Sequence, residues 1–280
     1  MATINDTTTA GNAEVADALL TAGIPRVATN VSPSDWGAAN AYPLDASSTG
    51  STLLMPQALV NEDATKIGII RADLAQASAL KGILAGMYEG QATFPMDSAV
   101  PPGTTDYSQF ILKAQDAGVD GVMLAIVEQE AIQVVNAAQQ LGSALRVAAT
   151  LGTFPYDAVA DFGEFAGQMA FLASFPPATF DLPVYEALRA DLAASGKDAL
   201  QPGQVKITSM RSWIGLYALL RMIRDTGLTE FTREGVTAML DAAKDVPMLD
   251  MFGGEDWTPA LDNPGNFKRA GTNYWGVYKW

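Results

Sequence analysis

A continuous apolar stretch, Val-Met-Leu-Ala-Ile at residues 122–126, constrains the fold of this chain more than any other feature. It has no polar residue that could mark a solvent-facing side, and this pattern is typical of a parallel strand that is covered on both faces. A helix capped by Asp106 and a tight turn at Gly118 are predicted before it, and a second helix that ends at Gly142 is predicted after it. Helix, buried strand and helix in this order predict an α/β fold with a mostly parallel sheet.

The alternation of strand and helix extends over most of the chain before Pro176. Strands are predicted at residues 1–4, 24–29, 66–70, 91–97, 121–126, 146–150 and 169–175. Helices are predicted between them at 10–21, 53–61, 75–88 and 156–165, and residues 35–50 are predicted to form a loop or crossover. Three helices without intervening strands follow at 183–194, 206–224 and 232–243, and residues 273–280 alternate like an edge strand. The first strand would have an unpaired edge, so we expect earlier strands that this sequence does not include.

The composition argues against several classes of function. The sequence has no histidine and no cysteine, which excludes imidazole-dependent dyads, thiolate catalysis and thiolate-bound metal sites. A formal net charge of -14 would repel phosphate backbones and anionic lipid, so nucleic acid and membrane surfaces are poor partners. No apolar run approaches the ~18 residues of a membrane helix, and no signal peptide is recognisable, so we expect no membrane insertion.

Four segments in order resemble one known family. They are TTTAGNAEVADALLTAGIPRV, KIGIIRAD, DYSQFILKAQDAGVDGVML and VVNAAQQLG. Each is weak alone, but together, at this spacing, they resemble the extracytoplasmic solute-binding proteins of the type I periplasmic fold. The resemblance is to the branched-chain amino acid (Leu/Ile/Val) binding family of ABC importers in particular, and it covers essentially the whole chain.

The resemblance implies two Rossmann-like lobes with mostly parallel sheets, joined by three crossovers. Lobe 1 would hold residues 1–50 and 176–252, and lobe 2 would hold residues 51–175 and 253–280. The first lobe of the family normally begins earlier, so the resemblance implies an N-terminally truncated lobe 1.

The function implied is that of the substrate-binding component of an ABC importer. It would trap a small amino-acid-like, amide or carboxylate solute in an interlobe cleft by hinge closure and pass it to permease subunits. The implied location is periplasmic or extracellular, with a cell-surface lipoprotein as one form of it. The resemblance implies no cofactor, no metal and no catalysis.

In lobe 1 the resemblance places ligand contacts after two strands. The positions that match the family's carboxylate-binding hydroxyl are Thr8 and Thr9, where a threonine at a helix start is also chemically suited to an anion. After the next strand, the matching positions are Asn30 and Ser32. The alternative for the threonines is a plain helix cap, and for Asn30 and Ser32 a turn before Pro33.

In lobe 2 the match weakens. The positions nearest to the family's ligand contacts, or able to replace them, are Asp73, Gln76, Glu128, Thr150 and Phe154. Where the family usually places an acid that accepts the ligand ammonium, this chain has Leu151. An ammonium buried without a carboxylate would cost several kcal/mol, so an aliphatic amino acid bound in the usual way is disfavoured.

Glu128 could replace that acid, because it follows the buried strand where ligands of open α/β sheets bind. Its alternative role is to stabilise the dipole of the next helix, which is worth ~0.3–1 kcal/mol. Asp73 could likewise be only a helix cap, and the ring of Phe154 could stack on a ligand or cover the sheet edge.

Two other functions remain open at this point. A sensor domain of the same fold would show the same sequence pattern. An α/β enzyme is disfavoured, because the sequence lacks G-x-G-x-x-G, G-x-S-x-G and G-x-x-x-x-G-K-[ST] as well as histidine.

Overall fold

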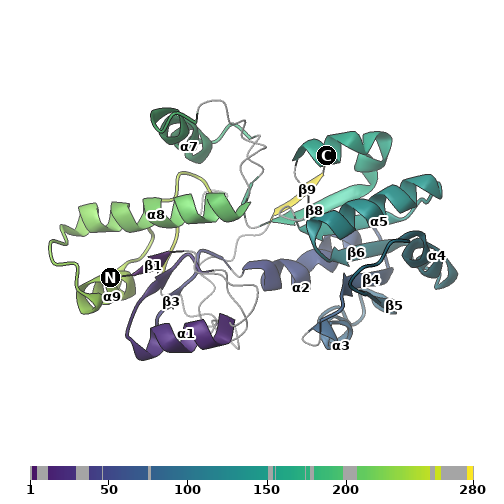
Figure 1. Cartoon of the computed structure of the whole chain (residues 1–280), viewed down its shortest axis with the longest axis horizontal. Helices are drawn as coiled ribbons and strands as arrows, with labels where there is room; N and C mark the ends of the chain where they lie inside the picture. The colour runs from purple at the N-terminus through teal and green to yellow at the C-terminus, as the bar shows by residue number, and fades with distance from the viewer. Residues whose placement is uncertain are drawn as a thin grey trace. The chain divides into compact units, whose positions relative to one another are not determined.

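The computed structural model describes most of the chain, and it divides the chain into two compact units. The described residues are 2–4, 12–29, 38–45, 47–74, 77–150, 154, 156–173, 175–176, 180–197, 207–252, 256–259 and 276–279. Unit 1 comprises Met1–Gly50 and Ser174–Gly276, and unit 2 comprises Ser51–Ala173 and Val277–Trp280 (Figure 1). The chain therefore passes between the units three times.

Unit 1 contains a three-stranded parallel sheet with strand order β1-β2-β3. The strands are β1 (Thr3–Ile4), β2 (Arg26–Val27) and β3 (Ala41–Tyr42). The helices are α1 (Asn12–Thr21), α7 (Pro183–Ala194), α8 (Ile207–Thr226) and α9 (Arg233–Ala242). Figure 1 shows α8 on one side of these strands and α1 on the other.

Strand β3 lies in a stretch that the sequence predicted to be a loop. Ala41 and Tyr42 are fully buried, and the Tyr42 hydroxyl donates a 2.8 Å hydrogen bond to Asp241 of α9. The backbone N–H of Ala28 donates to the Tyr42 carbonyl at 2.9 Å. The strand has only two residues, between Asn40 and Pro43, too few to show a periodicity in the sequence.

Gly215 allows α8 to approach the sheet closely. A Cβ at this position would lie 2.4 Å from the Cβ of Ala28 and 3.3 Å from Cγ2 of Ile4. Ala28 itself has a φ of 54°, an unusual backbone conformation for a residue with a side chain. Backbone and side chain are thus both constrained at the end of β2.

Replacing Gly215 with alanine is expected to lower the free energy of unfolding by ~1–3 kcal/mol, because overpacking outweighs the better helix propensity. The matched control is Gly82→Ala in α3 of unit 2, where an added Cβ meets no atom within 4 Å. There the same change should stabilise by ~0.5–1 kcal/mol. Urea denaturation of both variants tests this, and equal effects would contradict the close approach of α8.

Unit 2 contains a six-stranded sheet with the order β5-β4-β6-β7-β8-β9. The strands are β4 (Lys66–Ala72), β5 (Thr93–Val100), β6 (Gly121–Ala125), β7 (Arg146–Thr150), β8 (Met169–Ala173) and β9 (Gly276–Lys279). The helices are α2 (Ser47–Val60), which begins in unit 1, α3 (Leu80–Met87), α4 (Ser108–Asp116), α5 (Glu128–Gln140), α6 (Tyr156–Asp161) and the 3-10 helix η3 (Gly163–Gln168). The pairs from β5 to β8 are all parallel.

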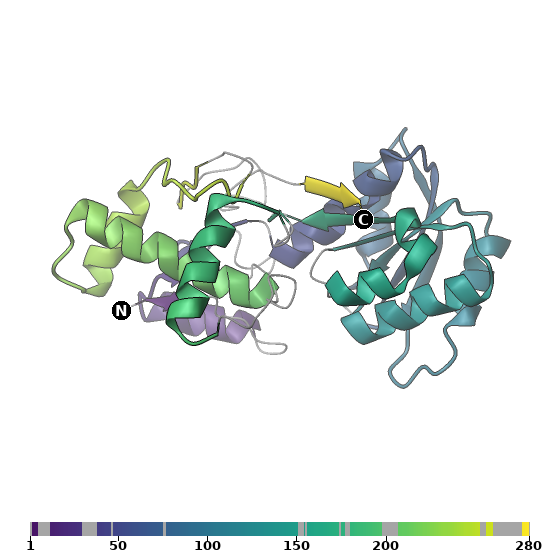
Figure 2. The same ribbon diagram turned by 90° about the horizontal axis from the view of Figure 1, so that it is seen from above.

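Helices cover both faces of this sheet, as the apolar strand predicted. Figure 2 shows α2 and α3 on one side of it and α4, α5 and α6 on the other. In β6, Val122 and Leu124 join the core under α4 and α5, and Met123 is fully buried as well. A Cβ on Gly121 would lie 3.0 Å from Leu59 of α2, so that helix packs directly on the strand.

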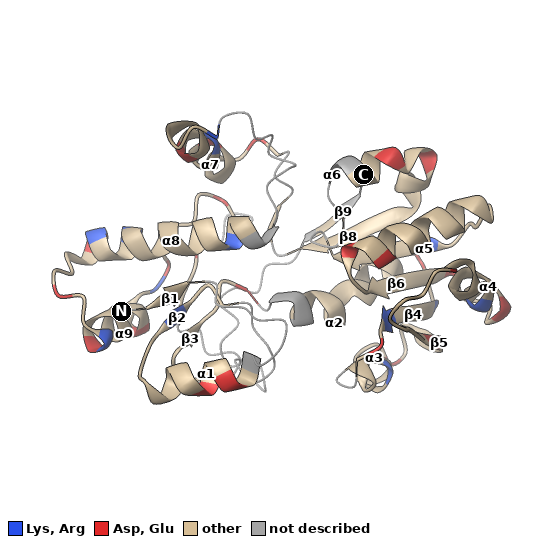
Figure 3. Ribbon diagram, viewed as in Figure 1, with Lys and Arg blue, Asp and Glu red and all other residues tan. Residues whose placement is uncertain are grey.

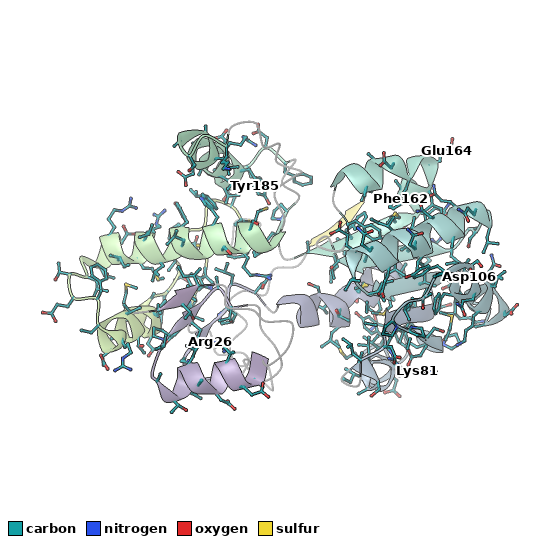
Figure 4. All side chains as sticks on the ribbon, in the orientation of Figure 1. Arg26, Lys81, Asp106, Phe162, Glu164 and Tyr185 are labelled. Atoms are coloured by element: carbon teal, nitrogen blue, oxygen red, sulfur yellow. The ribbon has the colours of Figure 1, made fainter. Side chains whose placement is uncertain are left out.

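Several details around β6 confirm the predictions. The Asp106 carboxylate accepts the backbone N–H of Ser108, the first residue of α4, at 2.9 Å (Figure 4). Gly118 and Gly142 have φ values of 61° and 58°, which end the two helices in the left-handed region that favours glycine. Strand β9 lies at the edge of the sheet, where its alternating pattern placed it.

The two units differ from the predicted lobes at the C-terminal part of the chain. Trp257 is fully buried in unit 1, where its indole N–H donates a 3.0 Å hydrogen bond to the carbonyl of Pro43 and its backbone pairs with Val246. The resemblance predicts residues 253–280 in lobe 2, whereas only Val277–Trp280 belong to unit 2.

Candidate functional site

The strand order of unit 2 reverses between β4 and β6. From β4 the chain continues to β5 on one side, and it then returns to β6 on the other side. In open α/β sheets the crevice at the carboxyl ends of two such strands is the usual place for a ligand. The register pairs Arg71 of β4 with Ala125 of β6, so the residues after them leave the sheet as neighbours.

Two carboxylates follow these strand ends. Asp73 comes directly after β4 and is exposed, and Glu128 is the first residue of α5 and is partly exposed. Neither carboxylate has a hydrogen-bond or ion-pair partner among the described residues. We call Asp73, Val127 and Glu128, with the first backbone N–H groups of α5, the switch-point edge of unit 2.

The start of α5 carries two acids but no side-chain cap. Val127 precedes the helix in an extended conformation, and its side chain makes no capping hydrogen bond. Glu128 and Glu130 both lie in the first turn (Figure 3). Partial burial and, second, the negative charge of Glu130 raise the pKa of Tyr107 on the α4 side. The charge of Glu130 is thus felt at Tyr107. Glu128 is the acid closest in the sequence to the end of β6.

An ion pair lies beside this edge. Arg71 contacts Asp97 of β5 through two hydrogen bonds, from Nε at 2.8 Å and from a terminal nitrogen at 3.3 Å. Both side chains are largely buried, with 13% and 17% exposed. The positive charge of Arg71 is thus already matched, and the switch-point edge keeps the negative character of Asp73 and Glu128.

The arrangement suits a ligand that donates hydrogen bonds. Carboxylate oxygens accept from ammonium, amide or hydroxyl groups, and the N–H groups at the start of a helix donate to an oxygen of the same ligand. Nothing in the described part of the chain gathers three or more potential metal-ligating side chains.

Phe154 and Thr150 lie at the carboxyl end of β7 and after it. The Phe154 ring is only 4% exposed and packs edge-on against Phe162 at 5.7 Å and Phe171 at 6.0 Å between ring centroids. It belongs to the core between the sheet and the helices α4, α5 and α6. Thr150 is paired with Leu172 of β8 and is partly exposed.

Five of the predicted contacts lie outside the described residues. These are Thr8, Thr9, Asn30, Ser32 and Gln76. Leu151, at the position of the missing ammonium acceptor, also lies outside them. Their roles therefore stay predictions. Of the predicted residues that the structure describes, Asp73, Glu128 and Thr150 lie at the carboxyl ends of the neighbouring strands β4, β6 and β7, and Phe154 lies in the core.

Thr29 of unit 1 is a candidate that the sequence analysis missed. It follows β2, is fully buried, and its hydroxyl has no hydrogen-bond partner among the described residues. The predicted strand at 24–29 includes Thr29, so the sequence alone did not mark it as a residue after a strand end. The available signal was a hydroxyl at the carboxyl end of a buried strand.

Replacing Thr29 with valine is expected to leave stability unchanged or slightly raised, because valine keeps the shape and removes an unpaired buried hydroxyl. If Thr29 contacts a solute, affinity should fall about 2- to 10-fold, the cost of one hydrogen bond. Thermal unfolding and solute titration of the variant test both parts. A clear loss of stability would show that the hydroxyl is bonded within the protein.

Two hollows lie away from the switch-point edge. One of about 230 Å³ lies near the amino ends of β7 and β8 and includes Glu62, Arg146 and Gln168 in its lining. Another of about 600 Å³ runs between α7 and α8 in unit 1 and includes Trp213, Leu216 and Leu220. Neither is at the carboxyl ends of strands.

Among the described helices, none is both long and apolar enough to cross a membrane.

Comparison with known proteins gives one family and many similar structures. The family described as periplasmic binding protein matches residues 2–270. A substrate-binding periplasmic protein from Ralstonia solanacearum is 19% identical with a TM-score of 0.77, over 99% of this chain and 76% of that one. No curated protein sequence matches this one closely enough to count as a relative.

Two further similar structures contain ligands. One is a branched-chain amino acid ABC transporter protein from Thermus thermophilus with bound valine, 14% identical with a TM-score of 0.74, over 98% of this chain and 73% of that one. The other is an ABC transporter solute-binding protein from Rhodopseudomonas palustris HaA2 with p-hydroxybenzoic acid, 15% identical with a TM-score of 0.71, over 98% and 77%. At these identities the likeness shows the fold.

Proposed function

The chain belongs to the periplasmic binding protein family and has its type I fold, and on that premise we propose that it is the substrate-binding component of an ABC importer. Its cargo would be a small amino-acid-like, amide or carboxylate solute, held by hinge closure between the two units and passed to permease subunits. The proposed location is the periplasm or the cell exterior. The observation that carries the proposal is the family match over residues 2–270, and the carboxylates at the switch-point edge support it.

The chemistry of the edge favours a solute with hydrogen-bond donors. Asp73 and Glu128 would accept from the solute, while Leu151 stands where an amino-acid ligand would need a carboxylate. An amide, or an acid with an additional hydroxyl or amide donor, needs no ammonium acceptor at position 151, whereas leucine or valine would need Glu128 to take that role. The similar structures with valine and with p-hydroxybenzoic acid show that this fold holds an amino acid in one protein and an aromatic hydroxy acid in another.

A thermal-shift panel on the full chain tests the proposal. The probes are leucine, valine, acetamide, urea, glutamine and p-hydroxybenzoate, each titrated to saturation. We expect a saturable rise in melting temperature with an amide or an aromatic acid, because a ligand that binds only the folded state stabilises it. A shift with leucine or valine alone would contradict the inference from Leu151, and no saturable shift with any solute would contradict solute binding by this chain.

Turnover separates binding from catalysis. We expect any solute that binds to be recovered unchanged after long incubation, as monitored by NMR of the solute. Conversion above the rate without protein would favour the α/β enzyme instead. A sensor domain of the same fold would pass both tests, and binding to the membrane permease in a reconstituted importer separates it from a transport protein.

A further inference from the structure

Two of the three connections between the units lie close to residues that contact one arginine of unit 1. The connections fall at Gly50/Ser51, Ala173/Ser174 and Gly276/Val277. Asp45 precedes the first connection by a few residues, and Phe175 is the second residue after the second connection. Both residues contact Arg211, which lies in α8.

The contacts of Arg211 are close and buried. A terminal nitrogen of its guanidinium lies 2.9 and 2.7 Å from the two carboxylate oxygens of Asp45. The guanidinium carbon lies 5.3 Å from the centre of the Phe175 ring, within cation–π distance. Asp45 and Phe175 are fully buried and Arg211 is 6% exposed. We call Arg211, Asp45 and Phe175 the connector clamp.

Further contacts fix the same two segments. The carbonyl of Pro43 accepts the indole N–H of Trp257, and the carbonyl of Pro176 accepts the hydroxyl of Tyr185 from α7 (Figure 4). Phe252 packs against Phe175 with 5.7 Å between ring centroids. Each connecting segment is thus tied to unit 1 by a second contact next to its contact with Arg211.

The stability of unit 1 alone does not explain why a buried ion pair lies at this place. A buried ion pair often contributes no more stability than an apolar pair of the same size, and its best-attested use is to fix one arrangement. Here the arrangement that is fixed is the path of the chain at two of the points where it leaves or enters unit 1. A planar guanidinium can hold a carboxylate with its edge and an aromatic ring with its face at the same time, whereas lysine cannot.

We infer that Arg211 is a positioning residue that holds two connections between the units at a fixed point on unit 1, and so limits the range of arrangements that the units sample. Its effect on solute binding rests on the proposed function, but its effect on the distance between the units does not.

Distance measurements between spin labels test the inference without a ligand. The sequence has no cysteine, so Asp17→Cys on α1 and Lys113→Cys on α4, both exposed, provide one label in each unit. We expect one narrow distance population with Arg211 present. Arg211→Met should replace it with a broad one, while the far-UV circular dichroism spectrum stays unchanged.

Control and second variants keep the test decisive. Leu240→Ala removes a fully buried side chain of α9 in the same unit that is not part of the connector clamp, and it should lower stability without broadening the distances. If Arg211→Met does not fold, Phe175→Leu and the paired replacement Asp45→Asn with Arg211→Gln take its place. Phe175→Leu should broaden the distance distribution. The paired Asp45→Asn and Arg211→Gln replacement keeps a hydrogen bond between the two side chains, so its distribution should be narrower than that of Phe175→Leu. Unchanged distances in every folded variant, or the same broadening in Leu240→Ala, would overturn the inference even if a solute binds.

Discussion

Replacing Asp45 with alanine is expected to lower the free energy of unfolding by ~3–5 kcal/mol, because it leaves the buried guanidinium of Arg211 without its carboxylate. The side chain of Arg211 is 7% exposed and that of Asp45 is fully buried, so water cannot replace the lost partner. Urea denaturation followed by tryptophan fluorescence measures this, since Trp213 and Trp257 lie in the same unit.

The control is an ion pair of the same residue types on the surface of unit 1. Asp181 and Arg189 lie 3.7 Å apart, with 90% and 41% of their side chains exposed. Asp181→Ala should change the free energy of unfolding by less than ~1 kcal/mol, because exposed pairs contribute little. Equal effects of the two substitutions would mean that the Asp45 pair is solvated, and the connector clamp would lose its physical basis.

Replacing Phe154 with alanine is expected to lower the free energy of unfolding of unit 2 by ~3–5 kcal/mol. Its ring is enclosed by Phe162 and Phe171, so truncation leaves a cavity and removes two edge-on aromatic contacts. The measurement is thermal or urea unfolding followed by far-UV circular dichroism.

Leu112→Ala on α4 is the control, because this side chain is 46% exposed and its removal should cost little. The comparison also decides between the two roles predicted for Phe154. A large loss of stability supports a ring that covers the sheet edge. A loss of solute affinity without a loss of stability would instead identify a ligand contact.

The fold of unit 2 was largely predictable from the sequence. The apolar stretch at 122–126 is typical of a strand covered on both faces, and Gly118 and Gly142 marked the helix ends on either side of it. These signals are local, because each depends on the periodicity or backbone preference of neighbouring residues.

The features that the sequence did not predict depend on long-range contacts. Asp45 and Arg211 are 166 positions apart, and no periodicity connects them. Strand β3 exists because Ala41 and Tyr42 pair with β2 and are buried there, although their neighbours have loop composition. The residues near Trp257 join unit 1 through the carbonyl of Pro43, a contact that composition cannot reveal.

The positions of two candidate residues in the fold were predictable, and their role in binding stays a prediction. Glu128 and Asp73 followed from the rule that ligands lie at the carboxyl ends of parallel strands, and the strand order places both at the reversal between β4 and β6. Thr29 was missed because the predicted strand continued past Val27, where β2 ends. The roles of Thr8, Thr9, Asn30, Ser32 and Gln76 remain predictions.

The most direct test of the central claim is calorimetric titration of the solute selected by the thermal-shift panel into the wild type, Glu128→Gln and Glu130→Gln. Both substitutions remove one negative charge from the first turn of α5, so they alter the helix dipole alike. We predict that Glu128→Gln weakens binding about 10- to 100-fold, the cost of a hydrogen bond to a charged group, and that Glu130→Gln leaves affinity nearly unchanged. Equal affinities of the two variants would contradict a solute site at the switch-point edge.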